Sequence, residues 1–261
     1  MWSIVRLSNV YNKDFNLKHM EENMKNKFVL IGFSSLFLVL TIAMVYLIIV
    51  VNKDKEVDSA DIFKNSLKSV VELKASSSDD NYVTYGTAVF IDENTLVTNA
   101  HMVTYKQSGV YNEYTKIEIR FSFEADYRQV FLMNYDLNKD LAFIKFNDTT
   151  ANYKVCTFND KKIHSGDIVY AVGNGMNHGI GITKGLVSLP LVNIEYDNYI
   201  KEVIQCDLII NDGNSGGALL DKNGKLIGIT TFRLKDNSGN VIYGIAYCIP
   251  ISIVLGYYNS L

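Results

Sequence analysis

The sequence predicts an all-β domain, either a barrel or a sandwich, preceded by one hydrophobic helix. Hydrophobic residues make up 48% of the 261 residues, and the strand-favouring residues Tyr and Phe occur 17 and 13 times. Residues 28–51 carry no charge. After residue 66 the chain is a succession of short apolar runs broken by Gly, Asn and Asp, which is typical of many short strands and not of a parallel α/β sheet.

Residues 28–51, FVLIGFSSLFLVLTIAMVYLIIVV, are predicted to form a retained transmembrane helix. A helix of this length spans about 36 Å, and the hydrocarbon core of a bilayer is about 30 Å thick. A soluble helix would show a polar face, and a signal peptide would have a shorter apolar stretch followed by a small-residue cleavage site. Charge does not orient the helix, because four lysines lie on each side: Lys13, Lys18, Lys25 and Lys27 before it, and Lys53, Lys55, Lys64 and Lys68 after it.

The chain is predicted to consist of a polar tail (1–27), the transmembrane helix (28–51), a polar tether (52–65) and a β-rich domain (66–261). Residues 66–76 are expected to begin as a helix and continue as a strand. Further strands are expected at the apolar runs 86–91, 95–100, 115–123, 141–146, 167–173, 185–189, 202–210, 217–220, 225–232 and 243–249. Hairpin turns are expected at ENT (93–95), DKNG (221–224) and DNSGN (236–240).

Composition excludes several classes of function. The net charge of −3 and the pI of about 5.8 argue against a nucleic-acid partner, which would require a basic face. Three cysteines, Cys156, Cys206 and Cys248, are too few for a disulfide framework, and no Cys/His spacing fits a zinc site. We expect three buried thiols, no metal site and no organic cofactor.

The stretch NDGNSGGALL (211–220) surrounds one serine, Ser215, with glycines. A serine hydroxyl needs a base to act as a nucleophile, and it needs N–H donors that stabilise the oxyanion formed on attack. Glycine at 213 leaves such donors unobstructed, and Gly216 and Gly217 are expected to leave room for substrate backbone and an imidazole. An ordinary glycine-rich turn between strands is the alternative interpretation of this stretch.

A base and an orienting carboxylate are the other groups that a nucleophilic serine requires. The sequence contains four histidines, and His101 ends a predicted hairpin, whereas His19, His164 and His178 lie in a tail, a turn and a glycine-rich loop. Among the acids, Asp140 directly precedes a predicted strand, which would fix its backbone. Asp136, four residues earlier, is the competing candidate.

Three motifs of this chain, TNAHMV, KDLAFIKF and NDGNSGGALLD, occur in the order His, Asp, Ser, which is the chymotrypsin order. Together they resemble the HtrA-like serine proteases of the chymotrypsin fold. YAVGNGMNHGIGITKGLVS, NGKLIGITT and YGIAYCIPISIV resemble further segments of the same family. The resemblance covers about residues 66–261. It implies two six-stranded antiparallel β-barrels of the chymotrypsin-like fold behind the single transmembrane helix.

The resemblance also implies a role for each motif residue. Ser215 would be the nucleophile, His101 the general base and Asp140 the orienting carboxylate. The oxyanion hole would consist of backbone N–H groups at Gly213, Asn214 and Ser215. The substrate-contacting strand would include Thr231, Phe232 and Arg233, although Phe232 also fits simple core packing. Phe232 and Arg233 are larger and more polar than the small aliphatic lining that this family would lead us to expect.

The expected function is that of a membrane-anchored serine endopeptidase that cleaves unfolded or exposed polypeptides. Anchored members of the family keep the protease outside the cytoplasm, so residues 1–27 would be cytoplasmic and residues 52–261 extracytoplasmic. Relatives often form homotrimers, and many carry a C-terminal PDZ domain, for which this chain ends too early. The alternatives are a catalytically weak or inactive peptide-binding pseudoprotease that acts as a membrane sensor, and an esterase that uses the same triad.

Overall fold

The chain forms two separate units, a long helix and a β-rich domain. The structure, a computed structural model, describes residues 2–53, 57–78, 81–148, 152–159, 161–196, 199–235 and 241–261. The units are Met1–Lys55 and Glu56–Leu261. The predicted turn at 236–240 lies outside the described residues.

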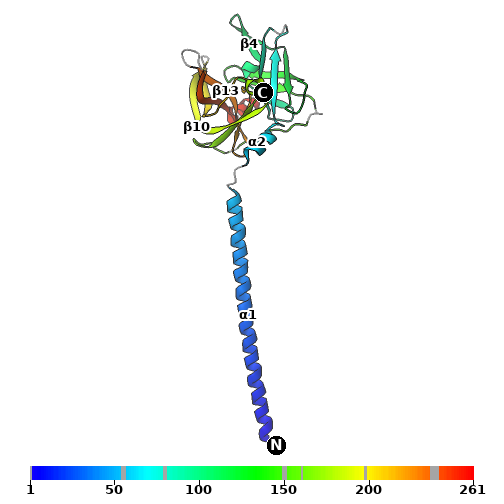
Figure 1. The fold of residues 1–261 in the computed structure, drawn as a ribbon, viewed down its shortest axis with the longest axis vertical. Coiled ribbons are helices and arrows are strands. Elements are labelled where there is room, and N and C mark those ends of the chain that lie inside the picture. Colours follow the sequence, from blue (N-terminus) through cyan, green and yellow to red (C-terminus); the bar gives the residue numbers. More distant parts are fainter. Residues whose placement is uncertain are drawn as a thin grey trace. The chain divides into compact units, whose positions relative to one another are not determined.

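The first unit is helix α1 (Trp2–Lys53), which is continuous (Figure 1). It begins well before residue 28, because no Gly or Pro interrupts residues 2–27. Within it, Met20–Val50 contains an 18-residue window with a mean hydropathy of 2.6 and is long and apolar enough to cross a membrane. The hydroxyl groups of Ser34, Ser35 and Thr41 each donate to a carbonyl three residues earlier, so these polar groups are satisfied inside the helix.

The first six-stranded barrel of the β-rich domain follows a short helix, α2 (Ser59–Ser66). Its strands are paired in the order β1-β2-β3-β8-β7-β6, and antiparallel pairing between β1 and β6 closes the ring. A hairpin of β4 and β5 lies outside it. The strands are β1 (Val70–Ser76), β2 (Val83–Phe90), β3 (Thr95–Thr98), β4 (Thr104–Gln107), β5 (Val110–Glu113), β6 (Lys116–Arg120), β7 (Arg128–Asp136) and β8 (Leu141–Lys145).

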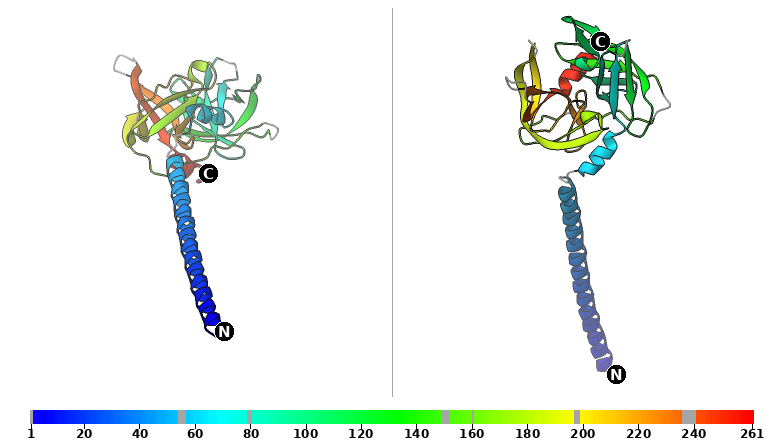
Figure 2. Two further views of the ribbon diagram at one scale, coloured as in Figure 1. Left: turned by 60° about the horizontal axis from the view of Figure 1, so that its bottom comes forward. Right: turned by 45° about the horizontal axis from the view of Figure 1, so that its top comes forward.

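The remaining six strands pair in the order β10-β11-β14-β13-β12-β9, and β9 pairs with both β10 and β12, so this ring also closes. Figure 2 shows the two sets of strands side by side. The strands are β9 (Ile168–Gly173), β10 (Gly181–Tyr196), β11 (Tyr199–Cys206), β12 (Ala218–Asp221), β13 (Leu226–Lys235) and β14 (Val241–Pro250), and helix α3 (Ile251–Tyr258) ends the chain. The all-β architecture predicted from the sequence is confirmed.

An apolar cluster joins the two barrels. It contains Val97 and Phe143 of the first barrel and Val172 and Ile229 of the second, packed with residues of both short helices. Strand β9, for example, supplies Tyr170 and Val172 to it, which is the alternation expected of a strand with one face in the cluster. Because its members come from both barrels, this cluster holds the two barrels together.

The start of the β-rich domain differs from the sequence prediction. Helix α2 covers residues 59–66, most of which were predicted to belong to the polar tether (52–65), and the compact domain begins at Glu56. Asp58 caps the helix by accepting the Ala60 N–H, and Ile62 is buried in the cluster between the barrels. A helix of two turns has too short an apolar pattern to be distinguished from a polar linker by sequence. The turns at 93–95 and 221–224 lie between strands as predicted.

Candidate active site

The loop that carries Ser215 joins β11 to β12. Gly213 and Gly216 have φ angles of +94° and +81°, which L side chains rarely adopt. A Cβ atom on Gly213 would lie 2.2 Å from the Asn174 carbonyl oxygen, and one on Gly216 would lie 2.1 Å from the Thr87 carbonyl oxygen. The space expected at Gly216 for a substrate is therefore filled by the protein's own backbone. These glycines allow the loop to turn tightly between the two barrels.

The backbone N–H groups of this loop differ in their partners. The Asp212 carbonyl accepts the Met176 N–H at 2.7 Å, and the Asn214 carbonyl accepts the Gly217 N–H at 2.9 Å. Because the peptide unit is trans and planar, the N–H groups of Gly213 and Ser215 point away from these partners. Neither has an acceptor among the residues that the structure describes. The Asn214 N–H instead donates to the Asn211 carbonyl at 3.0 Å, so it has no proton left for a substrate oxygen in this conformation.

Thr87, a buried residue of β2, holds the same loop from the first barrel. Its hydroxyl donates to the Gly213 carbonyl at 2.7 Å and accepts the Asn174 N–H at 2.9 Å. Its own N–H donates to the Ser215 carbonyl at 2.9 Å. Sequence reasoning missed Thr87, because a threonine in an apolar strand is ordinary until the partner loops are known.

His101 and Asp140 are in direct contact. His101 lies in the 3₁₀ helix η1 (Ala100–Met102), directly after β3, and Asp140 directly precedes β8, the partner strand of β3. The His101 Nδ1 atom lies 2.9 Å from both carboxylate oxygens of Asp140. The backbone N–H of His101 also donates to Asp140 Oδ1, at 3.1 Å. The side chain of Asp140 is 11% exposed and that of His101 42%. A carboxylate on Nδ1 favours the tautomer that leaves Nε2 free to act as a base.

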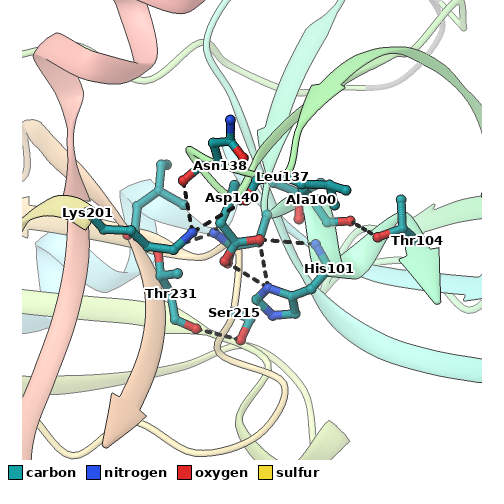
Figure 3. Close-up of polar contacts among 12 residues, drawn as sticks. Ala100, His101, Thr104, Leu137, Asn138, Asp140, Lys201, Ser215 and Thr231 are labelled. Atoms are coloured by element: carbon teal, nitrogen blue, oxygen red, sulfur yellow. Dashed lines mark hydrogen bonds and ion pairs between the residues drawn. The ribbon is translucent and has the colours of Figure 1, made fainter. Parts of the chain in front are cut away.

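The backbone of Asp140 is held in the left-handed region, with φ of +54°. Its carbonyl accepts the Asn99 side-chain N–H at 2.9 Å, and the buried Lys201 of β11 donates to the Asn138 carbonyl at 3.0 Å (Figure 3). The second barrel therefore supports the turn of the first barrel that carries Asp140. Neither Asn99 nor Lys201 was singled out from the sequence.

Asp136, the competing acid, has a different partner. Its carboxylate forms an ion pair with Lys139. Burial raises the pKa of the Asp136 carboxyl, but the hydrogen bonds from Lys139 outweigh this effect and leave the pKa below its usual value. Among the described residues, the only carboxylate in contact with the His101 imidazole is that of Asp140.

Ser215 and His101 line one cavity of about 610 Å³, together with Thr231, Phe232 and Arg233. The Ser215 hydroxyl donates to the Thr231 carbonyl at 2.9 Å, so its single proton is not directed at the imidazole (Figure 3). The pairing of β13 with β14 is irregular between Thr230 and Phe232. Phe232 also packs against Tyr247, with ring centroids 5.4 Å apart, so it contributes to the core as well as to the cavity wall.

The other candidate residues lie away from this cavity. His164 and His178 are exposed, and the side chain of His19 lies outside the described part of the chain. Three buried thiols were expected, but only Cys206 and Cys248 are buried, and Cys156 is half-buried. The described residues contain no group of three His, Cys, Asp or Glu side chains that could hold a metal ion.

Comparison with known proteins decides the family. Residues 86–229 match the model of the trypsin-like peptidase domain. This chain belongs to the family of trypsin-like peptidases and is of the HtrA type. The HtrA-like chain is similar to a probable periplasmic serine endoprotease, DegP-like, from Buchnera aphidicola subsp. Baizongia pistaciae. The two are 34% identical over 172 residues, and the aligned region covers 65% of this chain and 34% of the relative. The serine endoprotease DegS of Escherichia coli is 32% identical over 177 residues, covering 65% of this chain and 46% of that protein.

Solved structures agree with this assignment. The HtrA-type protease AlgW with a tripeptide matches the HtrA-like chain with a TM-score of 0.64 and 28% identity, covering 78% of this chain and 63% of that one. The resemblance to the HtrA-like family that the sequence motifs carry is therefore confirmed. The chain spans about a third to a half of the length of these curated relatives.

Proposed function

We propose that this protein is a membrane-anchored serine endopeptidase that cleaves unfolded or exposed polypeptides. The proposal depends chiefly on one observation. The His101 imidazole contacts the Asp140 carboxylate at 2.9 Å and lines the same cavity as the Ser215 hydroxyl. In this proposal the three side chains, from distant parts of the sequence, supply the nucleophile, the base and the orienting acid.

Catalysis begins with a rotation of the Ser215 side chain away from the Thr231 carbonyl and toward His101 Nε2. The imidazole then takes the hydroxyl proton as Oγ attacks the substrate carbonyl, and Asp140 stabilises the imidazolium. The N–H groups of Gly213 and Ser215 donate to the developing oxyanion, and we leave Asn214 out of this role because its N–H is committed to Asn211. His101 next protonates the leaving amine, and water hydrolyses the acyl-enzyme.

The substrate is a polypeptide that binds in extended form along β13. Thr231, Phe232 and Arg233 line the cavity beside Ser215, which makes them the candidate substrate contacts. An added strand would obtain main-chain hydrogen bonds from β13, and its side chains would enter the cavity alternately. Relatives of this chain are named as periplasmic serine endoproteases, which supports polypeptides as the substrate class.

The membrane role rests on the apolar segment Met20–Val50 of α1. We propose that this segment anchors the protein as a single span at residues 28–51, with residues 1–27 in the cytoplasm and the protease domain on the extracytoplasmic side. The periplasmic location in the names of relatives supports this orientation. A homotrimer is the proposed assembly, by analogy with the family.

Hydrolysis of casein by the full chain in detergent tests the catalytic proposal. Wild-type protein should degrade casein, Ser215→Ala should not, and Ser165→Ala, an exposed serine outside the cavity, should match wild type. A fluorophosphonate probe should label wild type but not Ser215→Ala. Peptide binding without labelling would indicate the pseudoprotease, and cleavage of esters without peptides would indicate the esterase.

Sealed vesicles and light scattering test the membrane and assembly proposals. In vesicles whose extracytoplasmic face is outward, added trypsin should digest the β-rich domain, and inverted vesicles should protect it. Protein recovered from the membrane by salt or alkaline washing would contradict a transmembrane span.

The detergent-corrected mass from light scattering should be three times that of one chain, and a monomer mass would contradict the trimer.

A further inference from the structure

Arg233 places a positive charge in the wall of the cavity that contains Ser215. Its guanidinium donates to the Asp212 carboxylate at 2.7 Å and to the Asn211 side-chain oxygen at 3.3 Å. Both partners belong to the loop that carries Ser215, and all of these residues line the cavity. A side chain that enters the cavity next to the cleaved bond therefore meets this guanidinium.

The ion pair of Arg233 with Asp212 is asymmetric in its exposure to solvent. The side chain of Arg233 is 15% exposed, whereas that of Asp212 is 94% exposed. A carboxylate in water gains little from an ion pair, because water screens the interaction and solvates the free carboxylate well. A guanidinium in a largely buried wall gains more from a charged partner. Asp212 is thus a partner that Arg233 can exchange for another carboxylate.

The other charged groups that line the cavity do not favour a cationic substrate side chain. Lys201 is buried there and adds a second positive charge. The Asp140 carboxylate is engaged by His101 through two contacts to Nδ1. Apolar residues such as Ile210 and Val241 complete the wall, so an ion pair formed inside is less exposed to water than one at the surface.

From this arrangement we propose that the protease prefers an acidic residue, Glu or Asp, on the acyl side of the cleaved bond, and that Arg233 is the residue that selects it. The substrate carboxylate replaces Asp212 on the guanidinium, whose planar fork can bind both carboxylate oxygens. Asp212 turns into solvent. This inference rests on the proposed function, since it names the substrate class of the Ser215 site.

Peptides that differ only in the acyl-side residue test the preference. The full chain in detergent is assayed with Glu, Gln, Val and Lys at that position, and kcat/KM is measured for each. Glu and Gln have the same shape, so their ratio isolates the charge. We expect Glu to exceed Gln by about 10-fold or more, as for loss of one charge-assisted hydrogen bond. Equal values for Glu and Gln, or a preference for Val or Lys, would overturn the proposal.

Variants of the ion pair separate selection from a structural role. Arg233→Gln should reduce the Glu/Gln ratio to about one, whereas Asp212→Asn should raise it, because it removes the competing carboxylate. Arg128→Gln is the matched control: Arg128 pairs with Glu124 in the first barrel, outside the cavity, and its loss should leave the ratio unchanged. The ratio is measured within one variant, so it does not depend on the fraction of folded protein. An unchanged ratio in Arg233→Gln would refute the role of Arg233.

A binding measurement keeps this inference distinct from the proposed function. If no peptide is cleaved and no probe labels Ser215, the endopeptidase proposal fails. The preference is then decided by calorimetry on Ser215→Ala with peptides that end in Glu or Gln as C-terminal amides. Tighter binding of the Glu peptide, lost in the Ser215→Ala/Arg233→Gln double variant, supports the acidic pocket. Equal affinity, or no binding of either peptide, overturns it.

Discussion

The hydroxyl of Ser215 donates its hydrogen bond to the backbone carbonyl of Thr231, 2.9 Å away. The proposed nucleophile, Ser215, and the proposed base, His101, line one cavity, but the hydroxyl proton of Ser215 is not directed at the imidazole in this structure. Because a hydroxyl has a single proton, catalysis requires Ser215 to rotate, and hydrogen bonds in unliganded active sites are often misaligned in this way.

Ser215 and His101 should therefore act as one unit. Ser215→Ala and His101→Ala are each expected to reduce kcat by about 10⁶-fold, because neither residue contributes without the other. The double variant should be no slower than either single variant. Casein hydrolysis with a fluorescent readout measures all three. A double variant that loses a further thousandfold would show that the two residues act independently.

Asp140 should contribute through the tautomer of His101. Asp140→Asn is expected to lower kcat by about 10⁴-fold, because an amide can hold the imidazole in the wrong tautomer. Asp136→Asn provides the matched control, since the Asp136 carboxylate pairs with Lys139. Its activity should stay within about twofold of wild type, as is usual away from a catalytic contact. Comparable losses in both variants would mean that the turn, and not the Asp140 carboxylate, supports catalysis.

The sequence predicted that His101 and Asp140 lie close together, because each lies beside a recognisable strand and the two strands, β3 and β8, are paired. It did not predict their supports. Thr87 and Lys201 act across the interface between the barrels, and such partners are set by which strands meet, which local patterns do not encode. The Asn214 N–H was expected to face the substrate, but peptide orientation in a glycine-containing loop depends on carbonyl partners such as those at Asp212 and Gly213.

The hydroxyl of Thr87 should hold the loop that carries Ser215 in the conformation required for catalysis. Thr87→Val keeps the volume but removes both hydroxyl hydrogen bonds, leaving the Gly213 carbonyl and the Asn174 N–H without that partner. We expect a loss of about 1–3 kcal/mol in the free energy of unfolding, the usual cost of an unsatisfied buried group. The kcat value should fall while KM changes little, because the loop acts on the transition state.

Thr87→Ser is the rescue variant, since it restores the hydroxyl and lacks only a methyl group. Denaturant unfolding and steady-state kinetics are measured on both variants. If Thr87→Val lost stability but kept wild-type kcat, Thr87 would be a packing residue only. If Thr87→Ser were as slow as Thr87→Val, the methyl group and not the hydroxyl would matter.

Cys156 should react with alkylating reagents as a thiol with a strongly raised pKa. Burial raises the pKa of Cys156 to about 12, although a hydrogen bond with Ser69 opposes this shift. A raised pKa means a smaller thiolate fraction at every pH below it, and only the thiolate reacts. The rate at which iodoacetamide alkylates Cys156 should therefore rise about tenfold per pH unit from pH 7 to 10 without levelling off.

Cys206 and Cys248 are buried and should not react in the native protein, so Cys156→Ser serves as the unlabelled control. A rate that levels off near pH 9 would show that the thiol lies in an aqueous environment, and the cluster between the barrels would then be open to water at this position.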